Sequence, residues 1–178
     1  MTLAVTVREA ADVDAERLQR FVAEIVGERL PVIFRRDRPP TVDEERDFMQ
    51  RVARAPRSFL LVADAGEEIV GMLDFHGHQK PQRSHAGEFG MSVAKLWRGR
   101  GVGSQLLAHL FGWALTEQLR RLELSVFSNN TGAMSLYERV GFLPEGTERE
   151  AVEVDGRYVD IVRMARTLSH PAAVGPAA

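Results

Sequence analysis

Apolar and polar residues follow two different periods along the chain. Some short stretches alternate between apolar and polar residues or are continuously apolar, and turn-forming residues flank them. This pattern predicts β-strands. Seven such stretches lie at residues 5–8, 58–63, 69–76, 85–94, 122–127, 142–153 and 158–165. The acidic turn 64–68 and the favoured two-residue turn Asp155-Gly156 predict hairpins between the strands that they join.

Other stretches carry an apolar residue every three or four positions, which predicts helices with one buried face. One follows residues 11–14, and the others lie at about 41–53, 101–118 and 131–139. The segment Thr41-Val42-Asp43-Glu44 resembles a capping box at the start of the second helix. The order β α α β β β α β α β β predicts an α/β (α+β) fold, with a mixed, mostly antiparallel seven-stranded sheet and helices on both faces.

Composition restricts the class of protein. The 178 residues are 44% hydrophobic and 27% charged, as in one globular domain, which we expect to span residues 1–167 before a disordered tail at 168–178. The net charge of −2 gives no general attraction to nucleic acid or an anionic membrane, so we expect neither partner, and any anion site must be local. No signal peptide or long apolar run is recognisable, so we expect a cytoplasmic protein. The absence of cysteine excludes a thiol nucleophile.

A glycine-rich loop follows the strand at 85–94. The segment Arg98-Gly99-Arg100-Gly101-Val102-Gly103-Ser104 joins this strand to the helix at 101–118. Glycine lets main-chain N–H groups turn toward a ligand, and the first turn of a helix leaves N–H groups unpaired and partly positive. With the two arginines, these features predict an anion site suited to a diphosphate. The plain alternative is a glycine-rich turn that only starts the helix.

Two other phosphate-binding motifs fit this loop less well. A Walker loop needs Gly-Lys-Ser/Thr, which the chain lacks. A dinucleotide fingerprint needs a third glycine where Ser104 stands, although Glu123 follows roughly twenty residues on as a ribose-binding acid would. Several elements also precede the loop, and few βαβ units follow it. An NAD(P)-binding oxidoreductase stays open as an alternative.

A second motif lies downstream of the loop and supports a family resemblance. Arg98-x-x-Gly101-x-Gly103 resembles the acyl-CoA signature of the GNAT superfamily of N-acetyltransferases. The segment from Asn130 to Phe142, NTGAMSLYERVGF, is similar to that family's N-x-x-A-x-x-L-Y-x-x-x-G-F segment. The end of the chain is similar to the branch that contains small-molecule and amino-acid N-acetyltransferases. The resemblance implies a sheet splayed at its centre, with acetyl-CoA between the strands 85–94 and 122–127.

The resemblance also implies roles for individual residues. Main-chain N–H groups of the loop would hold the diphosphate of CoA, and Tyr137 would protonate the leaving thiolate. Asn130 and the end of the strand at 85–94 would bond the pantetheine arm. The cofactor-binding residues implied in this way are Ser92, Val93, Arg98, Gly99, Arg100, Gly101, Val102, Gly103, Ser104 and Asn130. The alternatives are a core position for Tyr137 and a helix N-cap at Asn130.

Acetyl transfer to an amine needs a base, because alkylamines are largely protonated at pH 7. Glu88 is the candidate, since strand alternation places it on the same face as Ser92. In relatives this strand usually carries a bulge, which would re-aim its side chains. His76, His78 and His85 are rival bases, and an exposed carboxylate paired with an arginine is the plain alternative for Glu88. No acidic residues complete a metal site beside these histidines, so we expect no metal.

We expect the acceptor to be a small-molecule amine that attacks the thioester directly in a ternary complex. The candidate acceptor contacts are Phe34, Arg35, His76, His78 and Tyr158. One alternative function is acetylation of protein or peptide N-termini or of lysine, and another is a non-catalytic acyl-CoA sensor. The identity of the acceptor, the preferred acyl chain and the formation of a homodimer stay open.

Overall fold

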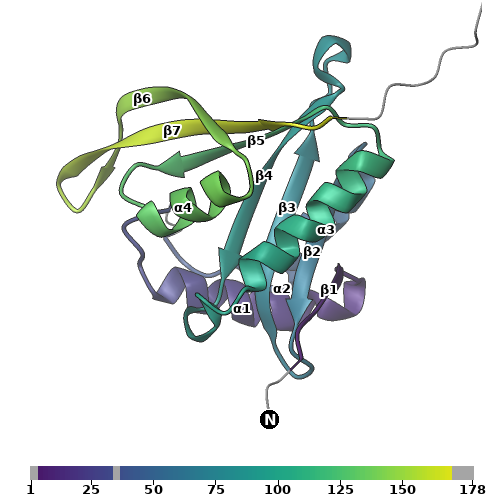
Figure 1. Cartoon of the computed structure of the whole chain (residues 1–178). Coiled ribbons are helices and arrows are strands. Elements are labelled where there is room, and N and C mark those ends of the chain that lie inside the picture. The colour runs from purple at the N-terminus through teal and green to yellow at the C-terminus, as the bar shows by residue number, and fades with distance from the viewer. Residues whose placement is uncertain (1–3, 34–36, 170–178) are drawn as a thin grey trace, which may run out of the picture.

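The computed structural model describes residues 4–33 and 37–169 (Figure 1). The helices of this part are α1 (Ala15–Gly27), α2 (Val42–Arg54), α3 (Val102–Thr116) and α4 (Thr131–Arg139). The strands are β1 (Thr6–Glu9), β2 (Ser58–Asp64), β3 (Ile69–Gly77), β4 (Ala86–Val93), β5 (Arg121–Phe127), β6 (Leu143–Val154) and β7 (Arg157–Thr167). The element order expected from the hydrophobic pattern is confirmed.

The strands form one seven-stranded sheet in the order β1-β2-β3-β4-β5-β7-β6. Every neighbouring pair is antiparallel except β4 and β5, which are parallel. These two strands pair only from Ala86 to Glu88 and from Arg121 to Glu123, and they separate beyond that point. The predicted fold class, a mostly antiparallel sheet splayed at its centre, is therefore confirmed.

Helices cover both faces of the sheet (Figure 1). On one face, α3 buries Leu106 and Leu110 in a core that also contains Phe89 of β4. On the other face, α1 and α2 lie against β3 and β2, and α1 buries Leu18 and Phe21 in a second core shared with both. Each apolar side chain of this size contributes about 1.5–3 kcal/mol when it is removed from water. The apolar helix stripes predicted from the sequence are the faces that the sheet covers.

Local sequence signals set two of the boundaries. Thr41 Oγ1 accepts a hydrogen bond from the N–H of Glu44 (3.2 Å), and the Glu44 carboxylate accepts one from the N–H of Thr41 (2.7 Å), so the predicted capping box is present. Asp155 and Gly156 have φ values of 51° and 74°, which the two-residue turn between β6 and β7 requires at both positions.

Packing against the core extends beyond residue 167, the predicted end of the domain. Leu168 is buried, and its N–H donates to the carbonyl of Arg120 (2.9 Å). The packed part therefore includes the first residue assigned to the tail, and the tail from residue 170 onward lies outside the described residues. No helix in residues 4–33 and 37–169 is long and apolar enough to cross a membrane.

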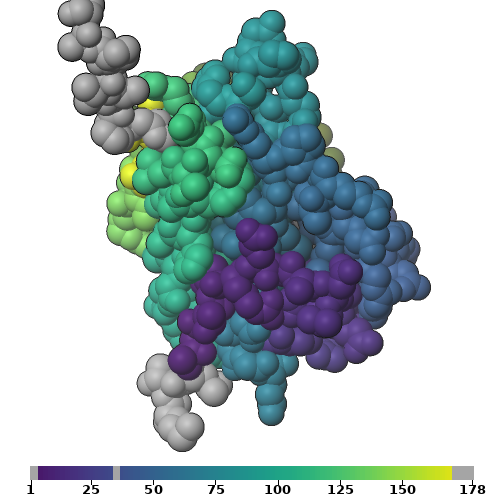
Figure 2. Space-filling view, turned by 90° about the vertical axis from the view of Figure 1, so that its right-hand side faces the viewer, coloured from purple at the N-terminus to yellow at the C-terminus, as the bar shows by residue number. Residues whose placement is uncertain are grey.

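The connection between β3 and β4 stands out from the body of the molecule (Figures 1 and 2). It is tied back to β5 at Glu123, which bonds His78 Nε2 (2.8 Å), Arg83 (2.6 Å) and Arg121 (2.5 Å). Burial opposes ionisation of this carboxylate, but the hydrogen bonds from Arg121 and His78 lower the pKa of Glu123 to about 2. Glu123 therefore anchors a loop, and it is not the ribose-binding acid of the dinucleotide alternative.

Candidate active site

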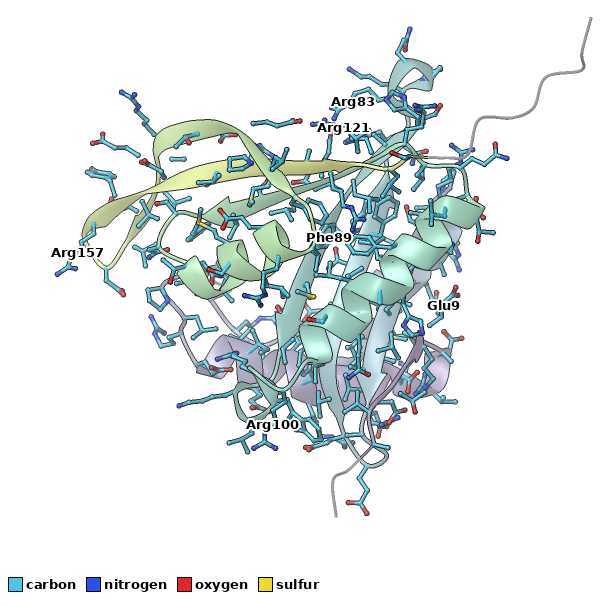
Figure 3. The ribbon with its side chains drawn as sticks, viewed as in Figure 1. Glu9, Arg83, Phe89, Arg100, Arg121 and Arg157 are labelled. Atoms are coloured by element: carbon cyan, nitrogen blue, oxygen red, sulfur yellow. The ribbon has the colours of Figure 1, made fainter. Side chains whose placement is uncertain are left out.

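The separation of β4 and β5 opens a groove of about 1040 Å³. Its walls come from β4 beyond Phe89, from β5 beyond Ser125, from the loop before α3 and from α4. Phe89 lies near the centre of the molecule, where the two strands part (Figure 3). Most of the site residues named from the sequence line this one groove: Ser92, Val93, Arg98, Gly99, Gly101, Val102, Gly103, Ser104, Asn130 and Tyr137.

The loop before α3 presents unpaired main-chain donors to the groove. Gly99 and Gly101 have φ values of 72° and 83°, which bend the chain sharply into the helix. Gln105 is the first residue after Arg98 whose N–H bonds a main-chain carbonyl, that of Gly101 (3.1 Å). Across residues 4–33 and 37–169, the N–H groups from Gly99 to Ser104 have no acceptor. Such a run of donors at a helix N-terminus favours a bound anion.

The guanidinium groups of both loop arginines contact other side chains of the protein. The Arg98 guanidinium binds both carboxylate oxygens of Glu28 (2.7 Å each), and its Nε donates to the Val93 carbonyl (2.9 Å). Arg100 stacks on Trp97, with its guanidinium carbon 5.9 Å from the ring centroid, and it does not line the groove. Arg98 therefore holds the loop against the end of α1, and a direct contact of Arg98 with the phosphate stays a prediction.

Arg98→Lys is expected to weaken CoA binding about threefold to tenfold, because an ammonium cannot reach both Glu28 and the Val93 carbonyl. Glu28→Gln, which leaves the loop itself intact, should have a similar effect. Calorimetric titration with CoA measures both changes. Full affinity in the lysine variant would mean that only the charge of Arg98 matters.

The segment Glu28–Ile33 leads from α1 to the groove, and hydrogen bonds from other parts of the chain hold it in place. Glu28 is held by Arg98, while the side-chain amide of Asn129 donates to the Pro31 carbonyl (3.0 Å). Asn130 caps α4 by accepting from the N–H of Ala133 (3.2 Å), and its Nδ2 lies 3.5 Å from the Val32 carbonyl. The N-cap expected at Asn130 is thus present, and its amide also lines the groove.

Tyr137 lies on α4 with its ring packed against Phe89 and Phe142, both at a centroid distance of 5.9 Å. The residue is 7% exposed, and burial raises the pKa of its phenol to about 12. No hydrogen bond to this hydroxyl occurs within the described ranges, although the residue lines the groove. The structure therefore combines the core position and the groove position that the sequence left as alternatives.

Glu88 lies on the sheet face that α1 and α2 cover only in part. The β3–β4 register runs without interruption from Gly71↔Val93 to Gly77↔Gly87, so no bulge re-aims its side chain. Its carboxylate is 43% exposed and accepts a hydrogen bond from Ser125 (2.7 Å), with Arg163 3.4 Å away. Glu88 does not itself line the groove, but Ser125 does. Ser125, which no sequence pattern singled out, connects Glu88 to the groove.

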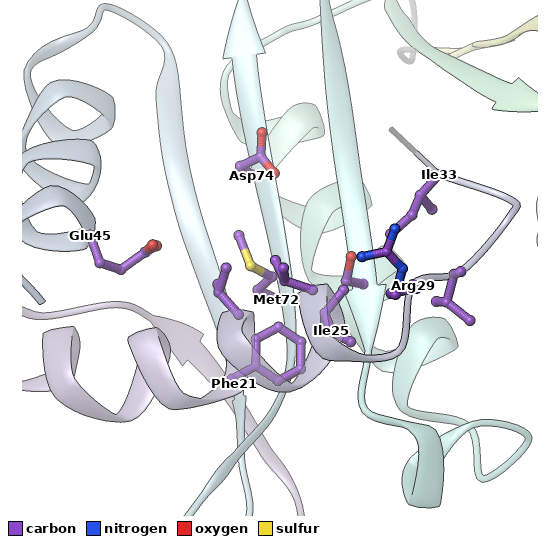
Figure 4. Close-up of a pocket in the computed structure, with 11 residues that line it drawn as sticks. Phe21, Ile25, Arg29, Ile33, Glu45, Met72 and Asp74 are labelled. Carbon is purple, nitrogen blue, oxygen red and sulfur yellow. The ribbon is translucent and has the colours of Figure 1, made fainter. Parts of the chain in front are cut away.

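A side cavity of about 190 Å³ adjoins the groove between α1, α2 and β3 (Figure 4). Five residues line both spaces: Ile25, Leu30, Ile33, Asp74 and Ser92. The charged groups on the side cavity are Asp74, Arg29 and Glu45, none of which was a candidate from the sequence. Asp74 lies opposite Gly90 in the β3–β4 register. Side chains two residues apart on a strand share a face, so Asp74 lies on the same face as the candidate His76. Strand alternation could therefore have added Asp74 to the candidates.

The predicted acceptor contacts are spread over the molecule. His76 lies two residues from Asp74 on β3, and its Nε2–H donates a hydrogen bond to the Asp74 carboxylate (2.9 Å), which raises the pKa of His76. His78 is bound to Glu123, and Tyr158 is 66% exposed beside Arg157 at the free end of the β6–β7 hairpin (Figure 3). Neither lines the groove or the side cavity, and the rival base His85 is exposed outside both. Phe34 and Arg35 lie outside the described residues.

The sequence also matches known proteins. Residues 22–142 match the model of the Acetyltransferase (GNAT) family. The chain belongs to this family. Membership of GNAT makes the protein an acetyltransferase and sets aside the NAD(P) alternative, as does a sheet with one parallel strand pair. Among residues 4–33 and 37–169 no three His, Asp or Glu side chains are grouped to hold a metal ion.

Two curated relatives are similar to the chain in sequence, and one solved structure is similar to it in fold. It is 36% identical over 123 residues to the L-amino acid N-acetyltransferase AaaT of Escherichia coli (strain K12), a match that covers 67% of this chain and 74% of the relative. It is 31% identical to the phosphinothricin N-acetyltransferase of Streptomyces coelicolor, over 94% of this chain and 98% of the relative. The fold matches a GNAT superfamily phosphinothricin acetyltransferase from Sinorhizobium meliloti in complex with AcCoA (TM-score 0.81, 20% identity, 97% and 93% of the two chains).

Proposed function

We propose that this GNAT protein moves an acetyl group from acetyl-CoA to the primary amine of a small molecule such as an amino acid. The observation that carries the donor assignment is the run of unpaired N–H groups from Gly99 to Ser104 at the head of the groove. A diphosphate is the anion that such a row of donors suits. The two curated relatives, named for L-amino acids and for phosphinothricin, support a small-molecule acceptor.

Different residues of the groove bind different parts of acetyl-CoA, which supplies an acetyl thioester. The loop N–H groups hold the diphosphate, and Ser92, Val93 and Asn130 bond the pantetheine arm along the separated strand edges. A main-chain N–H within residues 91–93 polarises the thioester carbonyl. Because β5 is unpaired with β4 beyond Glu123, the β4 edge is free to make these bonds.

The acceptor amine loses its proton before attack, and the Glu88 carboxylate receives it. Glu88 reaches the groove through the Ser125 hydroxyl, which donates to Glu88 (2.7 Å) and accepts from Arg163 (2.6 Å). The second lone pair of the hydroxyl oxygen is then available to a proton from the groove. Arg163 also binds Glu148 (2.7 Å), so its charge is shared and does not fix Glu88 in one ion pair.

Tyr137 assists the departure of the thiolate. A thiol has a pKa of about 8.5, and burial raises the pKa of Tyr137 to about 12, so complete proton transfer is uphill by about 5 kcal/mol even when the thiolate is fully formed, and by more before the C–S bond breaks. The phenol therefore stabilises the developing thiolate as a hydrogen-bond donor and passes its proton late in bond cleavage. The free hydroxyl at the groove suits this role.

Glu88→Gln is expected to lower kcat by about 10²-fold or more and to change the shape of the pH–rate profile, because an amide cannot accept the amine proton. Glu148→Gln is the matched control, since Glu148 also binds Arg163 but lies on β6 outside the groove. Steady-state rates from pH 6 to 10 measure both variants. An unchanged profile for Glu88→Gln would remove Glu88 as the base.

The proposed function is tested by release of free CoA with a thiol-reactive dye. The chain has no cysteine, so the dye reports CoA alone. The acceptor panel contains amino acids, a polyamine, an aminoglycoside and a lysine-containing peptide with a free N-terminus. Release with amino acids supports the proposal, and release only with the peptide favours a protein acetyltransferase. Tight CoA binding without release for any amine favours a non-catalytic sensor.

A further inference from the structure

Most residues that line the side cavity are apolar, and the cavity opens toward the place where the thioester is expected. Phe21 and Ile25 of α1, Met72 of β3 and Ile33 form much of its surface (Figure 4). It shares Asp74 and Ser92 with the groove, so a molecule that fills it has one end at the separated edge of β4. A cavity of this kind favours a ligand with an apolar body and a polar end.

Asp74 supplies a carboxylate oxygen at this junction. Its Oδ2 bonds His76 Nε2 (2.9 Å), whereas Oδ1 has no hydrogen-bond partner in the described ranges. A Cβ atom on Gly90 would lie 3.1 Å from Oδ1, so the free oxygen lies over the glycine at the strand edge that borders the groove. The Asp74 side chain is 24% exposed, which makes an ion pair with an entering ammonium stronger than at the open surface.

Arg29 supplies the opposite charge on the same cavity. Its guanidinium forms no ion pair or hydrogen bond in the described part of the chain, unlike those of Arg17, Arg98 and Arg163. It lies directly after α1 and reaches the cavity from the side opposite to Glu45 (Figure 4). Glu45 is 1% exposed and already has an interaction partner, so it is not available as a second ammonium site.

One class of amine matches this arrangement of groups. Resting on the proposed function, we propose that the acceptor is an α-amino acid with an apolar side chain, which lies in the side cavity with its ammonium at Asp74 and its carboxylate at Arg29. The ammonium then lies beside the groove, where Ser125 and Glu88 can receive its proton. A guanidinium binds a carboxylate through two parallel hydrogen bonds, which suits Arg29 to that end of the substrate.

The test compares each amino acid with the amine that lacks only its carboxylate. L-Leucine is paired with 3-methylbutylamine, and L-phenylalanine with 2-phenylethylamine, in the CoA-release assay. Arg29→Gln is expected to raise KM for the amino acids by about 10-fold to 100-fold and to leave KM for the matching amines unchanged. Arg20→Gln, on the exposed side of α1 and away from both cavities, is the matched control.

Asp74→Asn tests the other end of the acceptor. It is expected to raise KM about 10-fold to 100-fold for amino acids and amines alike, with KM for acetyl-CoA unchanged, because both acceptors carry the ammonium. Asp47→Asn on the exposed side of α2 is its control. Thermal unfolding of each variant verifies that the fold is kept.

The outcomes separate this inference from the proposed function. Equal effects of Arg29→Gln on an amino acid and its amine would overturn the carboxylate assignment. Efficient acetylation of polyamines or peptides, with no turnover of apolar amino acids, would overturn the inference and leave an N-acetyltransferase. Failure of the unmodified protein to release CoA with any amine would overturn both.

Discussion

Replacing Tyr137 by phenylalanine is expected to lower kcat by about 10²-fold, near the lower end of the range for acid–base catalysis. The effect stays near that end because a phenol with a pKa of about 12 is a weak acid toward a thiolate, so its contribution comes from a late hydrogen bond. Phenylalanine keeps the ring contacts with Phe89 and Phe142, so the affinity for CoA should be retained. Single-turnover rates of acetyl transfer measure the change directly.

The chain contains a matched control for this substitution. Tyr158 is the other of its two tyrosines, and it is 66% exposed outside the groove. Tyr158→Phe should leave the rate unchanged. Because burial raises the pKa of Tyr137, its phenol stays protonated in any assay below about pH 11, so a fall in rate between pH 8 and 10 belongs to another group. An unaltered single-turnover rate in Tyr137→Phe would exclude the residue from the chemistry.

Ser104→Glu is expected to weaken CoA binding by about 10-fold to 100-fold. The third residue of α3 lines the groove among the unpaired N–H groups, and a carboxylate there opposes the diphosphate at close range. A unit charge about 5 Å from the diphosphate costs roughly 1–3 kcal/mol at the dielectric of a partly exposed site. The same charge in the first helical turn favours the helix itself, so the fold should be kept.

Ala108→Glu is the control, because it puts the same charge on an exposed position one turn further along α3. Calorimetric titration with CoA compares the two variants. S-Acetylpantetheine, which has no diphosphate, should be used equally well by Ser104→Glu and by the unmodified protein. Unchanged affinity of Ser104→Glu for CoA would place the diphosphate away from this loop.

The elements of the fold were predictable because their signals are local. Thr41 and Glu44 cap their helix across three residues, and Asp155-Gly156 turns the chain within two. The anion site could be inferred for the same reason, since loop glycines and helix N–H groups are neighbours in the sequence. The splayed sheet and the position of Tyr137 followed from the family resemblance, because no local pattern determines which strands separate.

The rest of the site depends on contacts between distant parts of the chain. Arg98 binds a carboxylate 70 residues earlier, and Ser125 bonds one 37 residues earlier. The charges of Asp74 and Arg29 lie on one cavity because α1 packs on the face of β3 that carries Asp74. Spacing within the sequence contains no information on such a pairing. The sequence offered histidines as rival bases and as acceptor contacts, yet the Glu123 contact makes His78 part of a loop anchor.

The segment Glu28–Ile33 forms part of the wall of both the groove and the side cavity. Its fastening to the loop before α3 and to the turn before α4 means that a mutation there acts on two binding equilibria at once. Natural divergence toward a new amine is therefore easier through Phe21 or Met72, which border the side cavity alone, than through Leu30 or Ile33. An engineer who wants to retarget the enzyme without sacrificing donor affinity should randomise those two positions first.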